Sequence, residues 1–303
     1  MNFFTNLLKI FVSVGLAFWL INETNINNIL ELLLKLNWID FVLIFLVLLL
    51  EIFVASLRWN GVLKVLKIKI SYIESLKLLW IGLFFSQVMP SSLGGDLFKG
   101  YYLKQKGYTM KNTTLAILLD RIFGLFAMIL LVVLLLPLLF SIGLVPLARW
   151  SVISIIPLAI FALASLFLIE RMPAFISNLK PMQYLIDFVT KCRGLIFNKK
   201  TGFKLLLLSL FIHFLSIASI IVVSSSITDQ VPFMGLILVM PLVIFLMAIP
   251  ISIAGWGVRE GIMVIGLGYV GVSSDLSLAI SLVYGFSLLL VSLPGLALWL
   301  IRK

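Results

Sequence analysis

Long apolar runs recur along the whole chain, and they constrain its fold more than any other feature. Hydrophobic residues make up 62% of the 303 residues, whereas charged residues make up only 12%. A soluble domain carries about 25% charged residues, and an apolar run of about 20 residues matches the length of a membrane-spanning helix. The composition therefore excludes an ordinary soluble domain. It predicts a single all-α, polytopic integral membrane domain over residues 1–303, with no separate soluble domain.

The apolar runs predict about six full spans and two shorter, broken segments. A polar connector at 170–204 mixes apolar and basic residues at helical spacing, which is typical of a helix lying on the membrane surface. The first run is interpreted as a retained span, because no small-residue cleavage pattern follows it. The predicted full spans are Asn2–Ile21, Phe41–Leu57, Thr113–Leu136, Trp150–Ile169, Leu205–Ser226 and Leu276–Ile301.

The net charge of +11 arises from 23 basic and 12 acidic residues. In a soluble protein this excess would suggest a nucleic-acid partner, but here the basic residues gather in particular loops. Cytoplasmic loops of membrane proteins carry such an excess, and anionic headgroups attract it. The distribution predicts cytoplasmic N- and C-termini and no nucleic-acid partner. The basic segments counted as cytoplasmic loops are Arg58 to Lys77, Lys99 to Lys111, the connector, and Arg302-Lys303.

The apolar run that ends at Val88 is interrupted by helix-breaking and polar residues. Irregular backbone inside a bilayer is tolerated only where protein or a water-filled cavity surrounds it. Because both flanks are basic, we expect residues 76–96 to enter and leave the membrane on the cytoplasmic side, as a re-entrant hairpin. The alternative is an ordinary span followed by a basic loop. The interruption reads Met89-Pro90-Ser91-Ser92-Leu93-Gly94-Gly95-Asp96.

A second interruption, from Pro250 to Glu260, follows the apolar run 233–249. Like the first, it places a serine two residues after a proline, then a glycine, then a carboxylate. The predicted topology makes the two broken segments enter from opposite sides, an arrangement typical of transporter sites near the bilayer midplane. A broken helix also exposes backbone N–H groups that suit a phosphate or carboxylate. The alternative is two unrelated kinks.

Two adjacent charges, Asp120 and Arg121, fall inside a predicted span. Each costs at least about 2.5 kcal/mol in the membrane unless it finds a partner or water. Neighbours on a helix point about 100° apart, so at least one of them should reach another element. The candidate pairings are Arg121 with Asp96 or Glu260, and Asp120 with Arg259 or Lys99. These charges could equally be structural ion pairs, and Glu51 is a weaker candidate of the same kind.

The single histidine and the single cysteine point away from metal or redox chemistry. His213 lies in an apolar run, where an interhelical hydrogen bond is favoured over a proton relay. One cysteine, Cys192, excludes an intramolecular disulfide and a cysteine-rich metal site. The sequence therefore predicts neither a metal nor a cofactor.

These motifs together resemble the lysylphosphatidylglycerol synthase transmembrane-region family. The resemblance covers nearly the whole chain. It is carried by the residues from Met89 to Asp96, by Lys99 and Gly107, by Leu119-Asp120-Arg121-Ile122-Phe123-Gly124, and by the stretch from Ile249 to Gly261.

The resemblance implies a flippase-like domain in the inner membrane of a bacterium, or in an archaeal membrane, and assigns the polar motif positions to Asp96, Asp120, Arg121, Arg259 and Glu260. The chain departs from the family pattern at three positions. Ser92 and Lys99 stand where many members have arginine, and Gly285 follows Tyr284 where a basic residue is often seen. The chain also lacks the soluble synthase domain, so it is not expected to aminoacylate lipid.

The first functional hypothesis is a lipid flippase for a phospholipid or lipid-linked headgroup, and not an enzyme. Transport would be downhill or driven by an ion gradient or a partner, because no P-loop motif is present. The alternatives are a membrane partner of a polyprenyl-phosphate glycosyltransferase, or that enzyme itself, and a small-solute transporter. A homo-oligomer stays open. The predicted headgroup site comprises Ser92, Gly94, Gly95, Asp96, Lys99, Asp120, Arg121, Ser252, Arg259 and Glu260.

Overall fold

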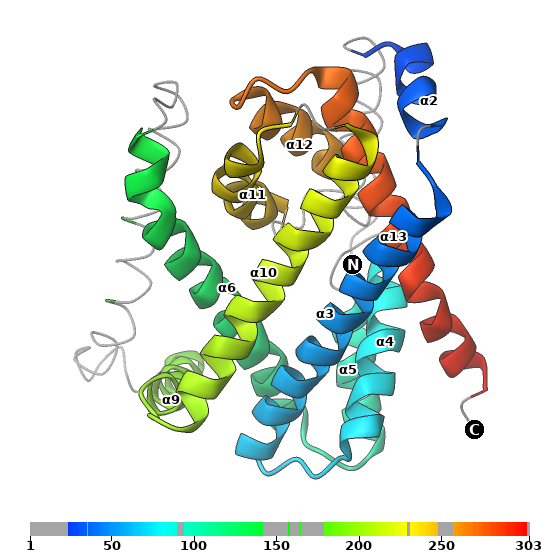
Figure 1. Cartoon of the computed structure of the whole chain (residues 1–303). Coiled ribbons are helices and arrows are strands. Elements are labelled where there is room, and N and C mark those ends of the chain that lie inside the picture. The colour runs from blue at the N-terminus through cyan, green and yellow to red at the C-terminus, as the bar shows by residue number, and fades with distance from the viewer. Residues whose placement is uncertain are drawn as a thin grey trace.

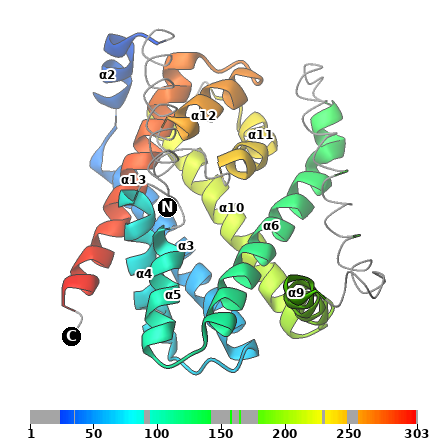
Figure 2. The same ribbon diagram turned by 180° about the vertical axis from the view of Figure 1, so that it is seen from behind.

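The computed structural model describes residues 24–34, 36–89, 94–141, 179–228, 231–247 and 257–301, and the single positions 157 and 164. Every regular element within these ranges is a helix, as the sequence predicts. The helices pack into one assembly of long rods and shorter helix pairs (Figures 1 and 2). The predicted span 2–21, and that at 150–169 apart from the two single positions, lie outside the described residues.

Four helices in the described part of the chain are long and apolar enough to cross a membrane. A helix of 27 residues, such as α10, is about 40 Å long, which exceeds the roughly 30 Å hydrocarbon core of a bilayer. All four coincide with predicted spans but are longer. They are α3 (Trp38–Val65), α6 (Met110–Ser141), α10 (Thr201–Ile227) and α13 (Ser274–Leu300).

Side chains cap the starts of several helices. The Asn37 side chain accepts hydrogen bonds from the N–H groups of Ile39 and Asp40 at the start of α3. Ser71 accepts from the N–H of Glu74 in α4, and Ser273 accepts from the N–H of Leu276 in α13. Such caps satisfy backbone donors that have no partner inside the helix. They fix where α3, α4 and α13 begin.

Helices α4 (Tyr72–Val88) and α5 (Gly94–Gln105) form the first helix pair. They pack on each other, and α4 also packs along α13. A side chain on Gly95 would overlap the backbone oxygen of Gly82, so the glycine is required for this close approach. Both helices lie in the lower half of the assembly in Figures 1 and 2. The residues that join them, 90–93, lie outside the described residues.

Helices α11 (Phe233–Met247) and α12 (Val258–Gly268) form the second pair and also pack on each other. They lie in the upper half, at the opposite end from α4 and α5 (Figures 1 and 2). Residues 248–256, which contain most of the second interruption, lie outside the described residues. The two interruptions of the sequence therefore belong to two helix pairs at opposite ends of the assembly.

Two short helices flank the long ones. Helix α9 (Lys180–Ile196) falls in the connector, where the sequence predicts a surface helix. Helix α2 (Ile26–Leu34) is tied to the start of α13, since Asp275 accepts hydrogen bonds from the Asn25 backbone at 2.8 Å and the Asn28 side chain at 2.9 Å. Both ends of the assembly thus carry helices outside the long rods.

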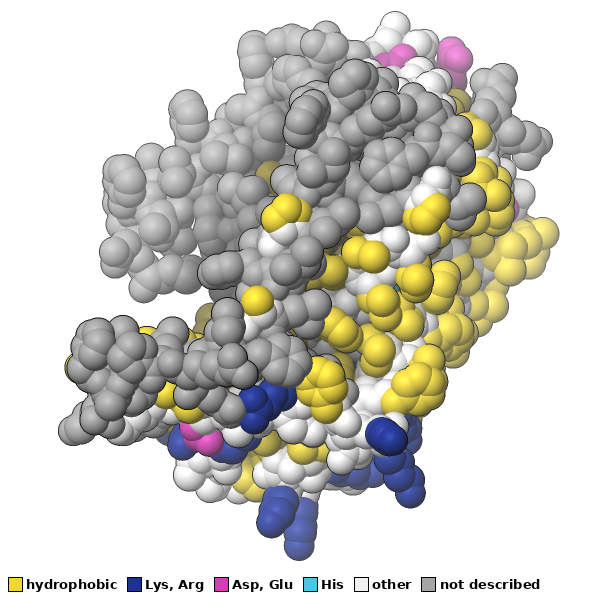
Figure 3. Space-filling model, turned by 90° about the vertical axis from the view of Figure 1, so that its left-hand side faces the viewer, with side chains coloured by type: hydrophobic (Ala, Val, Ile, Leu, Met, Phe, Trp, Pro, Cys, Tyr) yellow, Lys and Arg dark blue, Asp and Glu magenta, His cyan; other side chains and the backbone are white. Residues whose placement is uncertain are grey.

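The interior is apolar, and so is much of the outer surface. Trp59, Leu119 and Phe123 are at most 1% exposed in the lower core, which also contains Cys192. Phe211 and Phe214, in contrast, are 46% and 52% exposed on α10. Hydrophobic side chains cover much of the described surface in Figure 3, and lysine and arginine side chains gather at its lower end. This distribution is typical of a protein surrounded by lipid.

Candidate functional site: a charged cavity between helices

A cavity of about 220 Å³ lies where α3, α4, α5, α6 and α13 meet. Apolar side chains such as Leu48, Leu83 and Val291 form part of its wall. The rest of the wall is unusually polar for a position inside a helix assembly. Its polar and glycine lining consists of Glu51, Arg58, Gly82, Ser86, Gly95, Asp96, Lys99, Asp120 and Arg121.

Arg58 and Asp120 form a two-point ion pair between α3 and α6. The Arg58 Nε donates to Asp120 Oδ1 at 2.9 Å and its Nη2 donates to Oδ2 at 3.2 Å, while Nη1 donates to Ser209 of α10 at 3.2 Å. The two charged side chains are 13% and 11% exposed. This fork geometry matches a planar carboxylate and strengthens the pair. One arginine therefore connects three of the long helices.

The predictions for both partners of this pair were wrong. Arg58 was predicted to lie in a loop after a span ending at Leu57, whereas α3 continues to Val65. The helix continues because the next residues, including Trp59 and Leu63, are buried in the lower core. Asp120 was expected to face Arg259 or Lys99, and it faces Arg58 instead.

Asp96, in the first turn of α5, pairs with Arg121 of α6. The Arg121 Nε lies 2.5 Å from Asp96 Oδ2, which confirms one of the two partners predicted for Arg121. Lys99, one turn along α5, lies 3.3 Å from Asp96 Oδ1. The Lys99 amine also lies 4.8 Å from the ring centre of Trp59, a cation–π contact. Asp96 is thus held by two cations, and Arg121 keeps 41% of its side chain exposed.

Gly94 and Gly95 begin α5 and bring its N-terminus to the cavity wall. The Gly95 N–H donates to Ser86 Oγ at 3.2 Å, across the α4–α5 pair. Gly94 and Gly95 are both buried. Of the predicted site residues, the structure therefore brings Gly95, Asp96, Lys99, Asp120 and Arg121 to one cavity, with Gly94 beside it.

Arg259 and Glu260 form a separate cluster at the start of α12. Each is 3% exposed, and the Arg259 Nε donates to Glu260 Oε1 at 2.9 Å. The other carboxylate oxygen of Glu260 accepts the Gly257 N–H at 2.6 Å, which caps the helix. Neither residue lines the charged cavity. Arg121 was expected to pair with Glu260, and Asp120 with Arg259. Both expectations were wrong, because Arg259 and Glu260 pair with each other.

Ser92 and Ser252 lie outside the described residues, as do the prolines of both interruptions. The departure at Gly285 has a local physical reason. Gly285 of α13 faces Arg259, and a side chain at this position would overlap the guanidinium group. Its lack of a side chain therefore makes room for the buried arginine of α12.

The structure adds Arg58 to the site and raises the importance of Glu51. Positions 51, 55 and 58 recur at helical spacing, and all three line the cavity from α3. Glu51 Oε1 accepts the Ser216 hydroxyl of α10 at 2.8 Å, whereas its buried Oε2 has no hydrogen-bond partner among the described residues. The helical spacing of Glu51 and Arg58 is the sequence signal that would have found both.

The prediction for His213 has a simple structural outcome. His213 Nε2 of α10 donates to the Gly124 carbonyl of α6 at 2.9 Å, which confirms the predicted interhelical hydrogen bond. Within the described residues, no group of three or more histidine, cysteine, aspartate or glutamate side chains is placed to hold a metal ion. The cavity lining instead holds three cations, Arg58, Lys99 and Arg121, beside three carboxylates, and guanidinium and ammonium groups are the side chains that bind phosphate and carboxylate.

Comparisons with known proteins agree with the motifs and with the helical architecture. A search of curated proteins returns no match to this chain. A family profile described as the lysylphosphatidylglycerol synthase TM region matches residues 6–295, which span the charged cavity and both helix pairs. The chain therefore belongs to the lysylphosphatidylglycerol synthase transmembrane-region family.

Proposed function

We propose that this protein moves a phospholipid or a lipid-linked headgroup between the two leaflets of a membrane. The observation that carries the proposal is the cavity of about 220 Å³, which faces Arg58, Asp96, Lys99, Asp120 and Arg121. Charges inside a bilayer cost at least about 2.5 kcal/mol each, so they mark a route for polar groups more often than a packing device. The headgroup crosses through this cavity while the lipid chains remain among the exposed apolar side chains outside.

The two ion-pair systems have different roles in this proposal. Arg121 and Lys99 bind the lipid phosphate, because both are cationic, both line the cavity, and Arg121 is 41% exposed. Asp96 holds these cations when no headgroup is present and gives them up to the incoming phosphate. The better-buried pair of Arg58 and Asp120 keeps α3 and α6 in register. It acts as a structural brace beside the route.

The two helix pairs serve as gates that open on opposite sides. In this proposal α4 and α5 enter the membrane from one side and α11 and α12 from the other, consistent with their places at opposite ends of the assembly (Figures 1 and 2). Inverted broken segments support alternating access around a central site. Arg259 and Glu260 support the second gate.

The basic lower end faces the cytoplasm in this proposal, with both termini on that side of the cell membrane. The end of α3, the end of α5 and the start of α10 lie at this end, with Lys64, Lys104 and Lys199 in or next to them, whereas α2 with Glu31 and the start of α13 with Asp275 lie at the other. The distribution follows the positive-inside rule. The proposal contains no chemical step and needs no cofactor, because the lipid crosses unchanged.

The test is a liposome assay with lipids that carry a fluorescent headgroup label and a membrane-impermeant quencher. Wild-type protein is expected to make inner-leaflet label accessible, and Arg121→Gln to slow this exchange about tenfold through loss of a charge-assisted contact. Lys199→Gln, which removes an exposed cation outside the cavity, is the matched control and is expected to behave as wild type.

Two results would overturn the proposal. If wild-type protein moves none of several lipids, including a polyprenyl phosphate, the solute-transporter and enzyme-partner alternatives replace it. If Arg121→Gln, folded to the same yield, moves lipid as fast as wild type, the cavity charges are structural and the route lies elsewhere.

A further inference from the structure

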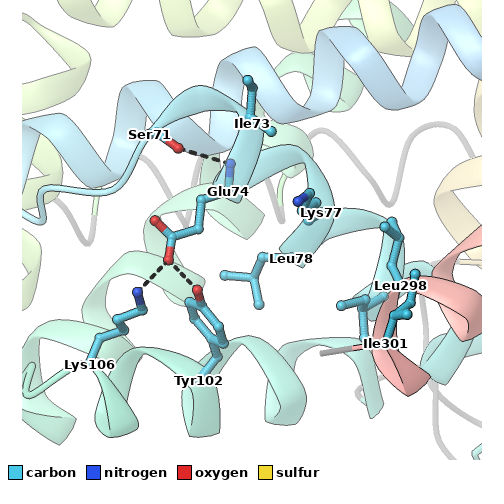
Figure 4. Close-up of a pocket in the computed structure, with 10 residues that line it drawn as sticks. Ser71, Ile73, Glu74, Lys77, Leu78, Tyr102, Lys106, Leu298 and Ile301 are labelled. Carbon is cyan, nitrogen blue, oxygen red and sulfur yellow. Dashed lines mark hydrogen bonds and ion pairs between the residues drawn. The ribbon is translucent and has the colours of Figure 1, made fainter. Parts of the chain in front are cut away.

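Figure 4 shows a second, larger cavity of about 530 Å³. The parts of α4, α5 and α13 that line it lie in the lower half of the assembly in Figure 1. The cavity is enclosed by the first turns of α4, the second half of α5 and the last turns of α13. It shares no lining residue with the charged cavity. Its lining consists of Ser71, Ile73, Glu74, Lys77, Leu78, Ile81, Tyr102, Lys106, Leu298 and Ile301.

One side of this cavity is a polar cluster centred on Glu74. The Tyr102 hydroxyl donates to the Glu74 carboxylate, and the Lys106 amine lies 2.8 Å from the same oxygen (Figure 4). Burial raises the pKa of Glu74, but the hydrogen bonds from Lys106 and Tyr102 outweigh it, so the pKa lies below its ordinary value. The carboxylate is therefore ionised, and the charge of Lys106 neutralises it.

Lys77 is the cation that this cluster does not neutralise. It lies three residues after Glu74 on α4, and within the described ranges it makes no ion pair. Figure 4 shows Lys77 above Leu78, between the Glu74 cluster and the end of α13. With Lys106 it gives the cavity two cations for one carboxylate. The remaining positive charge favours an anionic ligand.

The other side of the cavity is apolar and continues onto the outer surface. Leu78 and Ile81 are buried at its floor, and the wall opposite Glu74 is formed by Leu298 of α13 and by Ile301, the residue that follows this helix. Ile301 is 74% exposed and Ile73, at the rim, is 65% exposed. A ligand in this cavity thus meets charge at one end and a lipid-facing hydrocarbon surface at the other. A free inorganic anion would use only the first.

We propose that this cavity is a binding site for an anionic phospholipid of the leaflet at the basic end. Lys77 and Lys106 bind the phosphate, and the first part of an acyl chain lies over Leu298 and Ile301. A volume of about 530 Å³ is within the range of roughly 300–1,000 Å³ that small-molecule sites occupy. The inference goes beyond transport, since it assigns a resident lipid at the junction of α4, α5 and α13.

The test is a lipid titration of the detergent-solubilised full chain, read by native mass spectrometry. The probes are phosphatidic acid and phosphatidylcholine with the same acyl chains. Wild-type protein is expected to retain phosphatidic acid in preference, and Lys77→Gln to weaken its binding about fivefold, the effect of one lysine on an anionic lipid surface. Lys104→Gln removes an exposed lysine from α5 outside the cavity and is expected to leave binding unchanged.

Two further measurements distinguish binding of a lipid from binding of free inorganic phosphate. Ile301→Ser is expected to weaken phosphatidic acid binding, because the apolar wall loses contact with the chain. Inorganic phosphate at the same concentration as the lipid is expected not to displace it. The proposal is overturned if Lys104→Gln weakens binding as much as Lys77→Gln, if phosphatidylcholine binds equally well, or if inorganic phosphate displaces the lipid. Because the readout is binding, failure of the transport assay would not affect it.

Discussion

Arg58 of α3 and Asp120 of α6 are joined by two hydrogen bonds, although 62 positions separate them in the sequence. Their side chains are only 13% and 11% exposed, beside a cavity that Arg121 and Asp96 also line. Adjacent charges on α6 thus point to different partners: Asp120 reaches α3 and Arg121 reaches α5. The ion pairs of the site thus join α3, α5 and α6.

Asp120→Asn is expected to destabilise the protein by about 3–5 kcal/mol, since it leaves Arg58 without its carboxylate in a nearly buried position. The measurement is the midpoint of thermal unfolding in detergent. Asp187→Asn is the matched control: this aspartate pairs with Lys111 and Lys191 on the surface, where such pairs contribute at most about 1 kcal/mol. Equal shifts for the two variants would show that the Arg58 pair is not a brace.

Gly285→Ala is expected to destabilise the protein by about 1–3 kcal/mol, because the added methyl group overlaps the Arg259 guanidinium and forces it to move. The movement also strains the pair with Glu260. Gly268→Ala is the control, since a methyl group at that position meets nothing within 4 Å. Alanine is favoured over glycine in a helix, so this control should be neutral or stabilising. An unfolding midpoint for Gly285→Ala that matches the control contradicts the role of Gly285.

The long spans and the motif order follow directly from the sequence, because both are local. An apolar run of about 20 residues forms a spanning helix whatever surrounds it, which is why all four long helices coincide with predicted ones. The Asp96–Arg121 pair could also be predicted from the sequence, because the two residues lie on helices that follow each other in the chain. Arg58 was missed because a charge after an apolar run resembles the end of a span. The helix α3 continues past Arg58 to Val65 because Trp59 and Leu63 are buried in the lower core.

The partner of Asp120 could not be found from the sequence, since several cations were available and spacing does not rank them. Arg259 pairs with its own neighbour Glu260, which removes it from the choice. This pairing depends on Gly257 and Gly285, which let Glu260 cap α12 and Arg259 fold back against α13. Such relations are set by tertiary packing.

Glu74→Gln is expected to reduce the acid sensitivity of the fold. The pKa of Glu74 in the folded protein lies below its ordinary value of 4.5, because the hydrogen bonds from Lys106 and Tyr102 outweigh the effect of burial. A lowered folded-state pKa means that the ionised group stabilises the protein above pH 4.5, and that this stabilisation is lost as the pH falls through the lower value. Wild-type protein should therefore lose stability more steeply below pH 4.5 than Glu74→Gln.

The measurement for Glu74 is the unfolding midpoint in detergent at a series of acidic pH values. Glu31→Gln, which removes an exposed carboxylate of α2 at the other end, is the control and should retain the wild-type slope. If the unfolding midpoint of Glu74→Gln falls with pH as steeply as that of wild type, the hydrogen bonds from Lys106 and Tyr102 to the carboxylate do not stabilise the folded protein.

Cys192 is expected to react slowly with maleimide in the folded protein. It is buried in the lower core, and burial raises the pKa of its thiol to about 12, so almost none of the reactive thiolate is present near pH 7. Mass spectrometry of the labelled protein measures the reaction, with the denatured chain as the reference. Labelling at equal rates in both states would place Cys192 outside the core.

This low reactivity makes the chain suitable for a topology test with single added cysteines. Glu31→Cys marks the acidic upper end and Lys199→Cys marks the basic lower end, and both positions are exposed. An impermeant maleimide should label Glu31→Cys in intact cells, whereas Lys199→Cys should require permeabilisation, because basic ends face the cytoplasm. The reverse pattern would place Lys77 and Lys106 at the outer leaflet. The lipid for their cavity would then have to come from that leaflet, and α4 and α5 would open outward instead of inward.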